Sequence, residues 1–341
     1  MHRRLLLPAL AAVLALAVLS GCVGRATERS RNETPAGVAT AVVATADIPS
    51  IVRKLEPSIV TVYVGQGLGS GIVYKADGVI VTNHHVVGDT AQVMVGFADG
   101  QRVAGKVLAT DPVTDLAVVR VSRSGLPPAR FDTTLPAVGA LAIALGSPLG
   151  FANTATAGIV SGLGRAIPAE GAEGQPLVDL IQTDAAISPG NSGGALVNGA
   201  AAVIGVNEAY IPPAAGAVSL GFAIPSATVV NVVDQLLRGG RVQHAYLGIQ
   251  PTTLTPDIAQ QLGVDPTGGV VVQAVGPGGP AAVAGLRPGD IIVSIGGKPT
   301  PTTSALYEVL RDHKPGEKVE MRIMRDGAEQ PIMVTLGDRP S

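Results

Sequence analysis

A glycine-rich pentapeptide, Gly190-Asn191-Ser192-Gly193-Gly194, carries the serine best suited to act as a nucleophile. A serine hydroxyl attacks a carbonyl group only with a general base beside it and with donors for the oxyanion that forms. Flanking glycines let the backbone turn sharply, so that the main-chain N–H groups around Gly190, Asn191 and Ser192 can form an oxyanion hole. The plainer interpretation is an ordinary turn, because Gly-Asn and Ser-Gly are common turn dipeptides. The motif gains weight only if the chain also supplies a base and a carboxylate.

Both groups occur upstream, each next to an apolar run that predicts a strand. His84 and His85 follow residues 79–82, and Asp111 and Asp115 lie in a turn before the next apolar run. The order His, Asp, Ser is that of chymotrypsin-like two-barrel folds and not of subtilisin or α/β-hydrolase folds. A neutral histidine would take the serine proton, and a buried aspartate would fix the histidine tautomer. Successive strand residues point to opposite faces, so we expect only one histidine to reach the cleft.

At three motifs the chain resembles the HtrA/Deg family of serine proteases. The three motifs in this order are highly specific together, and the resemblance covers roughly residues 47–338. They are Thr-Asn-x-His-Val at 82–86, Thr-Asp-Leu-Ala-Val at 114–118 and Gly-Asn-Ser-Gly-Gly at 190–194. The family pattern implies that His85 is the base, Asp115 the orienting carboxylate and Ser192 the nucleophile, with His84 and Asp111 as local competitors.

Two sets of short, glycine-punctuated runs rich in valine and isoleucine predict a mostly β protein. The first set contains His85 and Asp115 and the second contains Ser192, which predicts a chymotrypsin-like double six-stranded β-barrel. Residues 226–238 predict a helix that Ser226 caps and that ends before Gly239. The expected strands are 59–64, 71–74, 79–82, 91–96, 103–109 and 116–121, and then 141–145, 155–161, 180–183, 195–197, 202–207 and 220–224.

The pattern changes near residue 246, and roughly residues 244–338 resemble a PDZ domain. Such a domain binds an extended C-terminal peptide by adding it to a sheet edge, while loop N–H groups hold the carboxylate. The alternative is a PDZ domain that only packs on the protease. Pro251, two residues after Ile249, lacks the N–H expected on the peptide-facing edge. The expected carboxylate loop is Tyr246, Leu247, Gly248 and Ile249.

The primary specificity pocket is expected to be small and apolar. Trypsin-like enzymes carry an acid six residues before the nucleophile, and here that position is Ala186, followed by Ile187. Cleavage after valine, alanine or isoleucine is therefore expected rather than after lysine or arginine. Asn207 and Glu208 are also assigned to this pocket, because their strand should pair with the substrate backbone. For Glu208 the alternative is a side chain that faces solvent.

The N-terminal residues resemble a bacterial lipoprotein signal. A basic start and a short apolar stretch lead to Leu-Ser-Gly-Cys, so we expect cleavage after residues 1–21 and acylation of Cys22. The alternative is an ordinary signal peptide or short anchor with an incidental cysteine. Residues 22–46 are expected to form a flexible tether, 47–240 the protease domain and 241–341 the PDZ domain. This organisation predicts export and lipid anchoring to the membrane of the cell envelope.

Composition narrows the range of partners. The 341 residues carry 24 Lys+Arg and 26 Asp+Glu, a formal charge of −2, without the basic footprint that nucleic-acid binding needs. The His and Cys residues have no metal-ligand spacing, and no cofactor is expected.

Taken together, the motifs and both resemblances predict a serine endopeptidase that cleaves misfolded or unfolded proteins and is regulated by C-terminal peptides at its PDZ domain. The alternative is a peptide-binding holdase or scaffold with a latent protease site. Family members are commonly trimers, so the resemblance offers a homotrimer as one assembly. The aromatic contacts that usually hold trimers are not evident before Tyr63, and the sequence leaves the oligomeric state open.

Overall fold

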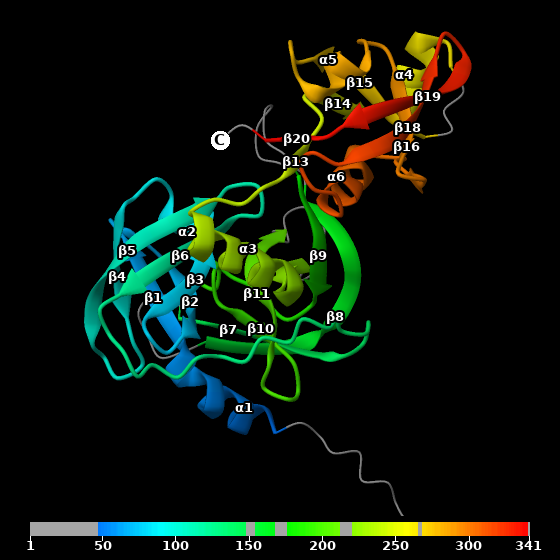
Figure 1. Cartoon of the computed structure of the whole chain (residues 1–341). Helices are drawn as coiled ribbons and strands as arrows, with labels where there is room; N and C mark the ends of the chain where they lie inside the picture. The colour runs from blue at the N-terminus through cyan, green and yellow to red at the C-terminus, as the bar shows by residue number, and fades with distance from the viewer. Residues whose placement is uncertain (1–46, 148–153, 168–175, 212–219, 265–267, 340–341) are drawn as a thin grey trace, which may run out of the picture. The chain divides into compact units, whose positions relative to one another are not determined.

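The computed structural model describes residues 47–147, 154–167, 176–211, 220–264 and 268–339. The expectations for the signal peptide, Cys22 and the tether lie outside these residues. In the described part of the chain, two closed six-stranded barrels precede a six-stranded sheet, as Figure 1 shows. The predicted mostly β architecture is confirmed.

The first barrel is antiparallel throughout, with strand order β1-β2-β3-β6-β5-β4 and closure between β4 and β1. Every run that the sequence predicted for this half is a strand. Strands β2, β3 and β5 extend beyond the predicted ends because the ladder continues past the apolar residues. Their bounds are β1 Ile59–Val64, β2 Gly67–Lys75, β3 Val79–Asn83, β4 Gln92–Gly96, β5 Arg102–Asp111 and β6 Leu116–Val121.

The second barrel has the order β10-β11-β12-β9-β8-β7 and closes between β7 and β10. Its strands also match the predicted runs. The ladder between β11 and β12 shifts register between Asn207 and Ala209, so Glu208 lies in a β-bulge. The bounds are β7 Leu141–Gly146, β8 Thr154–Ile167, β9 Leu177–Thr183, β10 Ala195–Val197, β11 Val203–Ile211 and β12 Leu220–Pro225.

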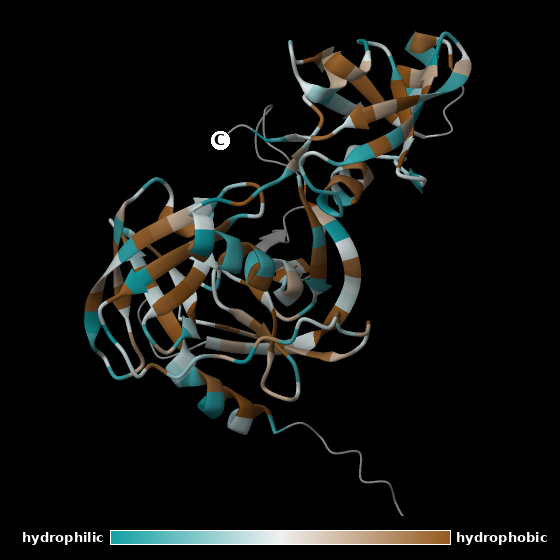
Figure 2. Cartoon of the chain, viewed as in Figure 1, coloured by the Kyte–Doolittle hydropathy of each residue, from teal (hydrophilic) through white to brown (hydrophobic). Residues whose placement is uncertain are grey.

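Two helices cover the barrels and join them. Helix α1 (Ile48–Leu55) leads through the short helix η1 (Glu56–Ser58) into β1, and Ile51 and Leu55 are buried. Helix α3 (Ser226–Gly239) contacts β5 and β6 of the first barrel and β11 and β12 of the second. Hydrophobic residues run along the strands of both barrels in Figure 2. One apolar cluster contains residues of both barrels and both helices, and this shared core couples their stability.

The ends of α3 differ from the prediction. Pro225 is the N-cap, and the Ser226 hydroxyl donates to the Val203 carbonyl at 2.7 Å instead of capping the helix. Gly239 is still helical, and Gly240, with φ of 69°, takes the left-handed position that ends the helix. A tertiary hydrogen bond to β11 thus replaces the local cap that the sequence suggested.

The C-terminal region forms a separate sheet with its own core. The strand order is β14-β15-β16-β18-β19, with β17 paired to β16, and β13 pairs with β20. Strand β14 is therefore an edge of the sheet, with one side free to accept another strand. The elements are β13 Ala245–Tyr246, β14 Ile249–Thr253, α4 Pro256–Leu262, β15 Val270–Val275, α5 Pro280–Ala284, β16 Ile291–Ile295, β17 Lys298–Pro299, α6 Thr303–Arg311, β18 Lys318–Arg325, β19 Ala328–Thr335 and β20 Gly337–Asp338.

Candidate active site

Both candidate histidines lie on a one-turn helix, α2 (His84–Val87), directly after β3. The expectation that strand alternation separates them is therefore wrong. The strand ends because the Asp115 carbonyl accepts from the Asn83 side-chain amide and from the His84 N–H, both at 3.0 Å. These bonds turn the chain out of the ladder and bring α2 against the turn before β6.

His85 and Asp115 form a tight pair. The His85 ring nitrogen Nδ1 lies 2.5 Å from Asp115 Oδ2, and the His85 main-chain N–H donates to Asp115 Oδ1 at 2.8 Å. An ionised carboxylate only accepts, so Nδ1 carries the hydrogen and Nε2 is left as the base. Asp115 is 7% exposed and has a φ of 54°, a left-handed conformation that few residues other than glycine adopt. The fold thus holds Asp115 in a strained position against the imidazole.

The two local competitors have other surroundings. The His84 Nδ1 atom is buried without a hydrogen-bond partner among the described residues. Asp111 accepts from the Thr114 hydroxyl at 2.5 Å and lies 2.8 Å from the Nε2 atom of His244. Geometry therefore favours His85 and Asp115 as the working pair.

The nucleophile loop is bound to the first barrel through Ser70, a residue that sequence reasoning did not single out. The Ser70 hydroxyl donates to the Gly190 carbonyl at 2.6 Å, and the Ser70 N–H donates to the Ser192 carbonyl at 2.8 Å. A Cβ atom on Gly193 would lie 2.2 Å from the Ser70 carbonyl oxygen, and its φ is +81°, so only glycine fits there. This close approach holds the Ser192 loop of the second barrel against β2 of the first barrel.

The Ser192 hydroxyl donates to the Glu208 main-chain carbonyl at 2.9 Å. No hydrogen bond between Ser192 and His85 occurs among the residues that the structure describes. The N–H groups of Gly190 and Ser192 have no acceptor within the same residues, which leaves both available to an oxyanion. The Asn191 N–H is engaged instead, because it donates to the Ser188 carbonyl at 2.9 Å.

Glu208 is buried beside the triad. It is 5% exposed, which excludes the alternative that it faces solvent. The Asn83 side-chain amide donates to Glu208 Oε2 at 2.6 Å, and Oε1 lies 3.6 Å from His85 Nδ1. Burial first, and then the neighbouring Asp115 carboxylate, raise the pKa of Glu208 well above its usual range.

The other residues assigned to the specificity pocket differ in their exposure to solvent. Ala186 is exposed, whereas Ile187 is 4% exposed and packs in the core of the second barrel. Asn207 is fully buried, and its side-chain amide donates to the carbonyls of Leu145 at 3.1 Å and Ala195 at 3.3 Å. Asn207 thus supports the barrel backbone, and only Ala186 is open to a ligand from solvent.

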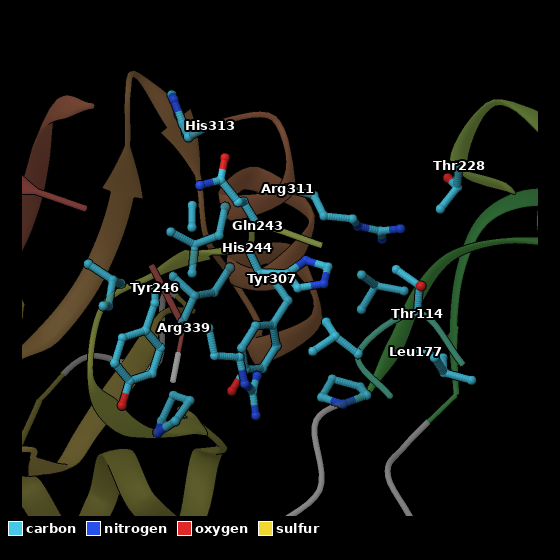
Figure 3. Close-up of a pocket in the computed structure, with 18 of the residues that line it drawn as sticks. Thr114, Leu177, Thr228, Gln243, His244, Tyr246, Tyr307, Arg311, His313 and Arg339 are labelled. Carbon is cyan, nitrogen blue, oxygen red and sulfur yellow. The ribbon is translucent and has the colours of Figure 1, made fainter. Parts of the chain in front are cut away.

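The predicted carboxylate loop connects β13 to β14 at the edge of the C-terminal sheet. The N–H groups of Leu247 and Gly248 have no acceptor within the described parts of the chain, and Gly248 has a φ of +79°. The loop lines a pocket with β14 and α6, in which Figure 3 shows Tyr246, Tyr307 and Arg311. Pro251 also lines this pocket, together with residues of the barrels such as Thr114 and Leu177.

Two general features bear on cofactors and membranes. His85, Asp115 and Glu208 each place a ligand atom within 4.8 Å of the others, a grouping that their sequence spacing did not indicate. Hydrogen bonds to each other and to Asn83 engage these atoms.

Within the described ranges, the helices are all too short or too polar to span a bilayer.

Comparisons with known proteins agree with this geometry. Residues 69–206 match a model of the trypsin-like peptidase domain, and residues 245–336 match a model of the PDZ domain. The putative serine protease HhoB of Synechocystis is 43% identical over 286 residues, which are 81% of this chain and 67% of that protein. The chain belongs to the HtrA/Deg family of serine proteases.

Further relatives support the family assignment. A probable periplasmic serine endoprotease, DegP-like, of Ectopseudomonas mendocina is 39% identical over 276 residues. The match covers 81% of this chain but only 57% of that relative, so this HtrA/Deg chain spans little more than half of its length. The structure of the HtrA-type protease AlgW with a decapeptide has a TM-score of 0.72 and 30% identity, covering 86% of this chain and 99% of that one.

Proposed function

We propose that this HtrA/Deg protein is a serine endopeptidase that cleaves misfolded or unfolded proteins through an acyl-enzyme. The contact that carries the proposal is the 2.5 Å approach of His85 Nδ1 to Asp115 Oδ2 in the first barrel. Ser70 of the same barrel binds the loop that carries Ser192. This contact leaves Nε2 to take the Ser192 proton while the hydroxyl oxygen attacks the peptide carbonyl. The same nitrogen then protonates the leaving amine, and water releases the acyl group by the reverse steps.

The Gly190 and Ser192 N–H groups would stabilise the oxyanion of each tetrahedral intermediate. Their lack of acceptors among the described residues supports this role. Removing one such donor typically lowers kcat by about 10²- to 10³-fold. The exposed Ala186 side chain carries no counter-charge, which supports cleavage after small aliphatic residues.

The PDZ domain would regulate this activity by binding C-terminal peptides. Two observations support it: β14 is an edge strand, and the Leu247 and Gly248 N–H groups lack acceptors in the described structure. A peptide that adds to β14 would place its carboxylate at these groups. Two known relatives fit the same picture, one named as a periplasmic protease and one solved with a decapeptide.

For the rest of the chain we propose export, removal of residues 1–21 and lipid attachment to Cys22. Residues 22–46 would tether a protease domain of residues 47–240 and a PDZ domain of residues 241–341. Lipid attachment at Cys22 would hold the protein at the membrane of the envelope, where unfolded exported proteins are its substrates. A homotrimer is the proposed assembly.

A fluorophosphonate probe and unfolded casein test the proposed activity. We expect the wild type to react with the probe and to degrade casein, and Ser192→Ala to do neither. Ser188→Ala is the matched control, because Ser188 lies in the same loop and is exposed. An unreactive wild type, or full labelling of Ser192→Ala, would contradict the proposal.

A second function, a holdase with a latent site, has one observation in its favour. Ser192 donates to the Glu208 carbonyl and not to the triad histidine. A holdase would suppress the aggregation of an unfolded protein equally well as wild type and as Ser192→Ala. If the wild type does so but never degrades the bound protein, the holdase function is the correct one.

A further inference from the structure

Glu208 is a buried carboxyl group that the reaction of Ser192, His85 and Asp115 does not itself require. Its Oε2 accepts from the Asn83 amide at 2.6 Å, and its Oε1 lies 3.6 Å from His85 Nδ1. One ligand atom each of Glu208, Asp115 and His85 lies within 4.8 Å of the other two. A second acid therefore lies against the acid that orients the catalytic base.

The β-bulge explains why this side chain points inward. The register between β11 and β12 shifts from the pair Asn207–Ala223 to the pair Ala209–Phe222, with Glu208 as the additional residue. Bulges commonly re-aim one side chain and are frequent next to active sites. Here the bulge turns Glu208 toward β3 and α2 while its carbonyl accepts from Ser192.

Counting hydrogens shows which form of Glu208 fits this position. Asp115 accepts from the His85 main-chain N–H and from Nδ1, as an ionised carboxylate does. Two carboxyl groups can hydrogen-bond each other only when one of them carries a proton. Glu208 Oε2 accepts from Asn83, as the carbonyl oxygen of a neutral acid would, which leaves Oε1 to carry the hydrogen.

We propose that Glu208 is a positioning residue of the protease site, where, as a neutral carboxylic acid, it donates a hydrogen bond to Asp115 and holds that carboxylate against His85. The inference rests on the proposed protease function. Burial and the Asp115 charge both raise the pKa of Glu208, in agreement with the neutral form. The hydroxyl hydrogen of Glu208 remains on Glu208 during turnover, so it adds no step to the reaction.

The role makes activity dependent on the protonation of Glu208. Among the side chains that the structure describes, the histidine and carboxylate grouped with Glu208 are His85 from α2 and Asp115 from the turn before β6. The neighbouring Asn83 on β3 is neutral, as are the paired residues Phe222 and Ala223 on β12. When Glu208 ionises, its charge repels Asp115 and stabilises the imidazolium form of His85, so that fewer molecules hold an oriented free base. Activity should therefore fall on the alkaline side as Glu208 loses its proton.

Three variants of the full chain test the inference through kcat/KM against pH with a peptide substrate. Glu208→Gln keeps one acceptor and one donor but cannot ionise, and Glu208→Ala keeps neither. We expect the alkaline loss of wild-type activity to disappear in Glu208→Gln and to remain in the matched control Glu56→Gln. We also expect kcat of Glu208→Gln to exceed that of Glu208→Ala by about tenfold, because glutamine keeps an acceptor for Asn83 and a donor for Asp115 and alanine removes both. Superimposable pH profiles of wild type and Glu208→Gln, or equal losses in the glutamine and alanine variants, would overturn the proposal.

An infrared measurement tests the same proposal without catalysis. In the Ser192→Ala background near neutral pH, we expect the carbonyl stretch of a neutral carboxylic acid that Glu208→Gln removes and Glu56→Gln retains. Absence of this difference band refutes a neutral Glu208 whatever the activity of the wild type. An inactive wild type with the band present would refute the protease function alone, so the two failures are distinguishable.

Discussion

Ser192 donates its hydroxyl hydrogen bond to the main-chain carbonyl of Glu208, 2.9 Å away. In the proposed mechanism Ser192 must release this carbonyl before His85 can take the proton, because the hydroxyl has only one hydrogen to donate. Catalytic hydrogen bonds are often incomplete without substrate and form in the substrate complex. The His85–Asp115 pair, by contrast, is already formed at 2.5 Å. In the proposed mechanism the base is thus oriented in advance, and the change that remains is the exchange of the Ser192 acceptor.

Removing any one triad side chain should abolish most peptidase activity. We expect Ser192→Ala, His85→Ala and Asp115→Asn each to lower kcat/KM on a peptide substrate by about 10⁴-fold, with double variants losing little more. His84→Ala is the control on the same helix turn and should be far milder. A wild-type rate for His85→Ala together with a loss in His84→Ala would reassign the base.

Lipid modification should place the mature N-terminus at Cys22. Mass spectrometry of the membrane fraction should find an acylated Cys22 and no residues 1–21. Cys22→Ala should shift the protein to the soluble fraction, because its only thiol is then gone. An unmodified wild type that begins at another residue would contradict this expectation.

Cleavage should occur after small aliphatic residues. Sequencing the fragments of unfolded casein should show valine, alanine or isoleucine before most cut sites, because burying an unpaired lysine or arginine beside Ala186 is costly. Ala186→Asp, which supplies a counter-charge, should increase the share of cuts after lysine and arginine. A wild type that cuts mainly after basic residues would refute the expected pocket.

The PDZ domain should bind C-terminal peptides weakly and should bind more tightly after Pro251→Val. The substitution restores one N–H on β14, worth about 0.5–1.5 kcal/mol, so affinity should rise by at most about tenfold. Calorimetry on the full chain in the Ser192→Ala background avoids cleavage of the peptide. Amidating the peptide carboxylate should lower the affinity by more than the proline at position 251 lowers it, because the peptide then loses a charged acceptor. If amidation has no effect, the domain does not recognise chain ends.

Stability should depend on pH through Glu208. Folding raises the pKa of Glu208. Its contribution to the free energy of unfolding is therefore complete below its pKa in the unfolded chain, about 4.3, and is lost as the pH rises through its pKa in the folded protein. In the Ser192→Ala background, Glu208→Gln should therefore gain in Tm relative to its parent as the pH increases from mildly acidic to alkaline. Thermal unfolding at several pH values measures the difference. A difference that stays constant would mean that Glu208 titrates alike in both states.

The sequence by itself determined the architecture and the identity of the chemical groups. Strands alternate and are bounded by glycine and proline, so runs such as 59–64 and 116–121 could be placed from local pattern alone. The motifs around His85, Asp115 and Ser192 indicated the chemistry because nucleophilic catalysis needs those residue types together. The family signatures of both domains are local in sequence, and the comparisons confirm them.

Tertiary structure alone decided how these groups meet. The bond from Asn83 to the Asp115 carbonyl, which helps to end β3 before the histidines, joins residues from different segments, and no local pattern reports it. The bulge at Glu208 depends on its register against β12, so the sequence suggested a substrate contact or a solvent-facing side chain where the structure has a buried acid. Hydrogen-bond partners and burial are set by segments distant in the chain, and these long-range contacts give the acid beside Asp115 its raised pKa.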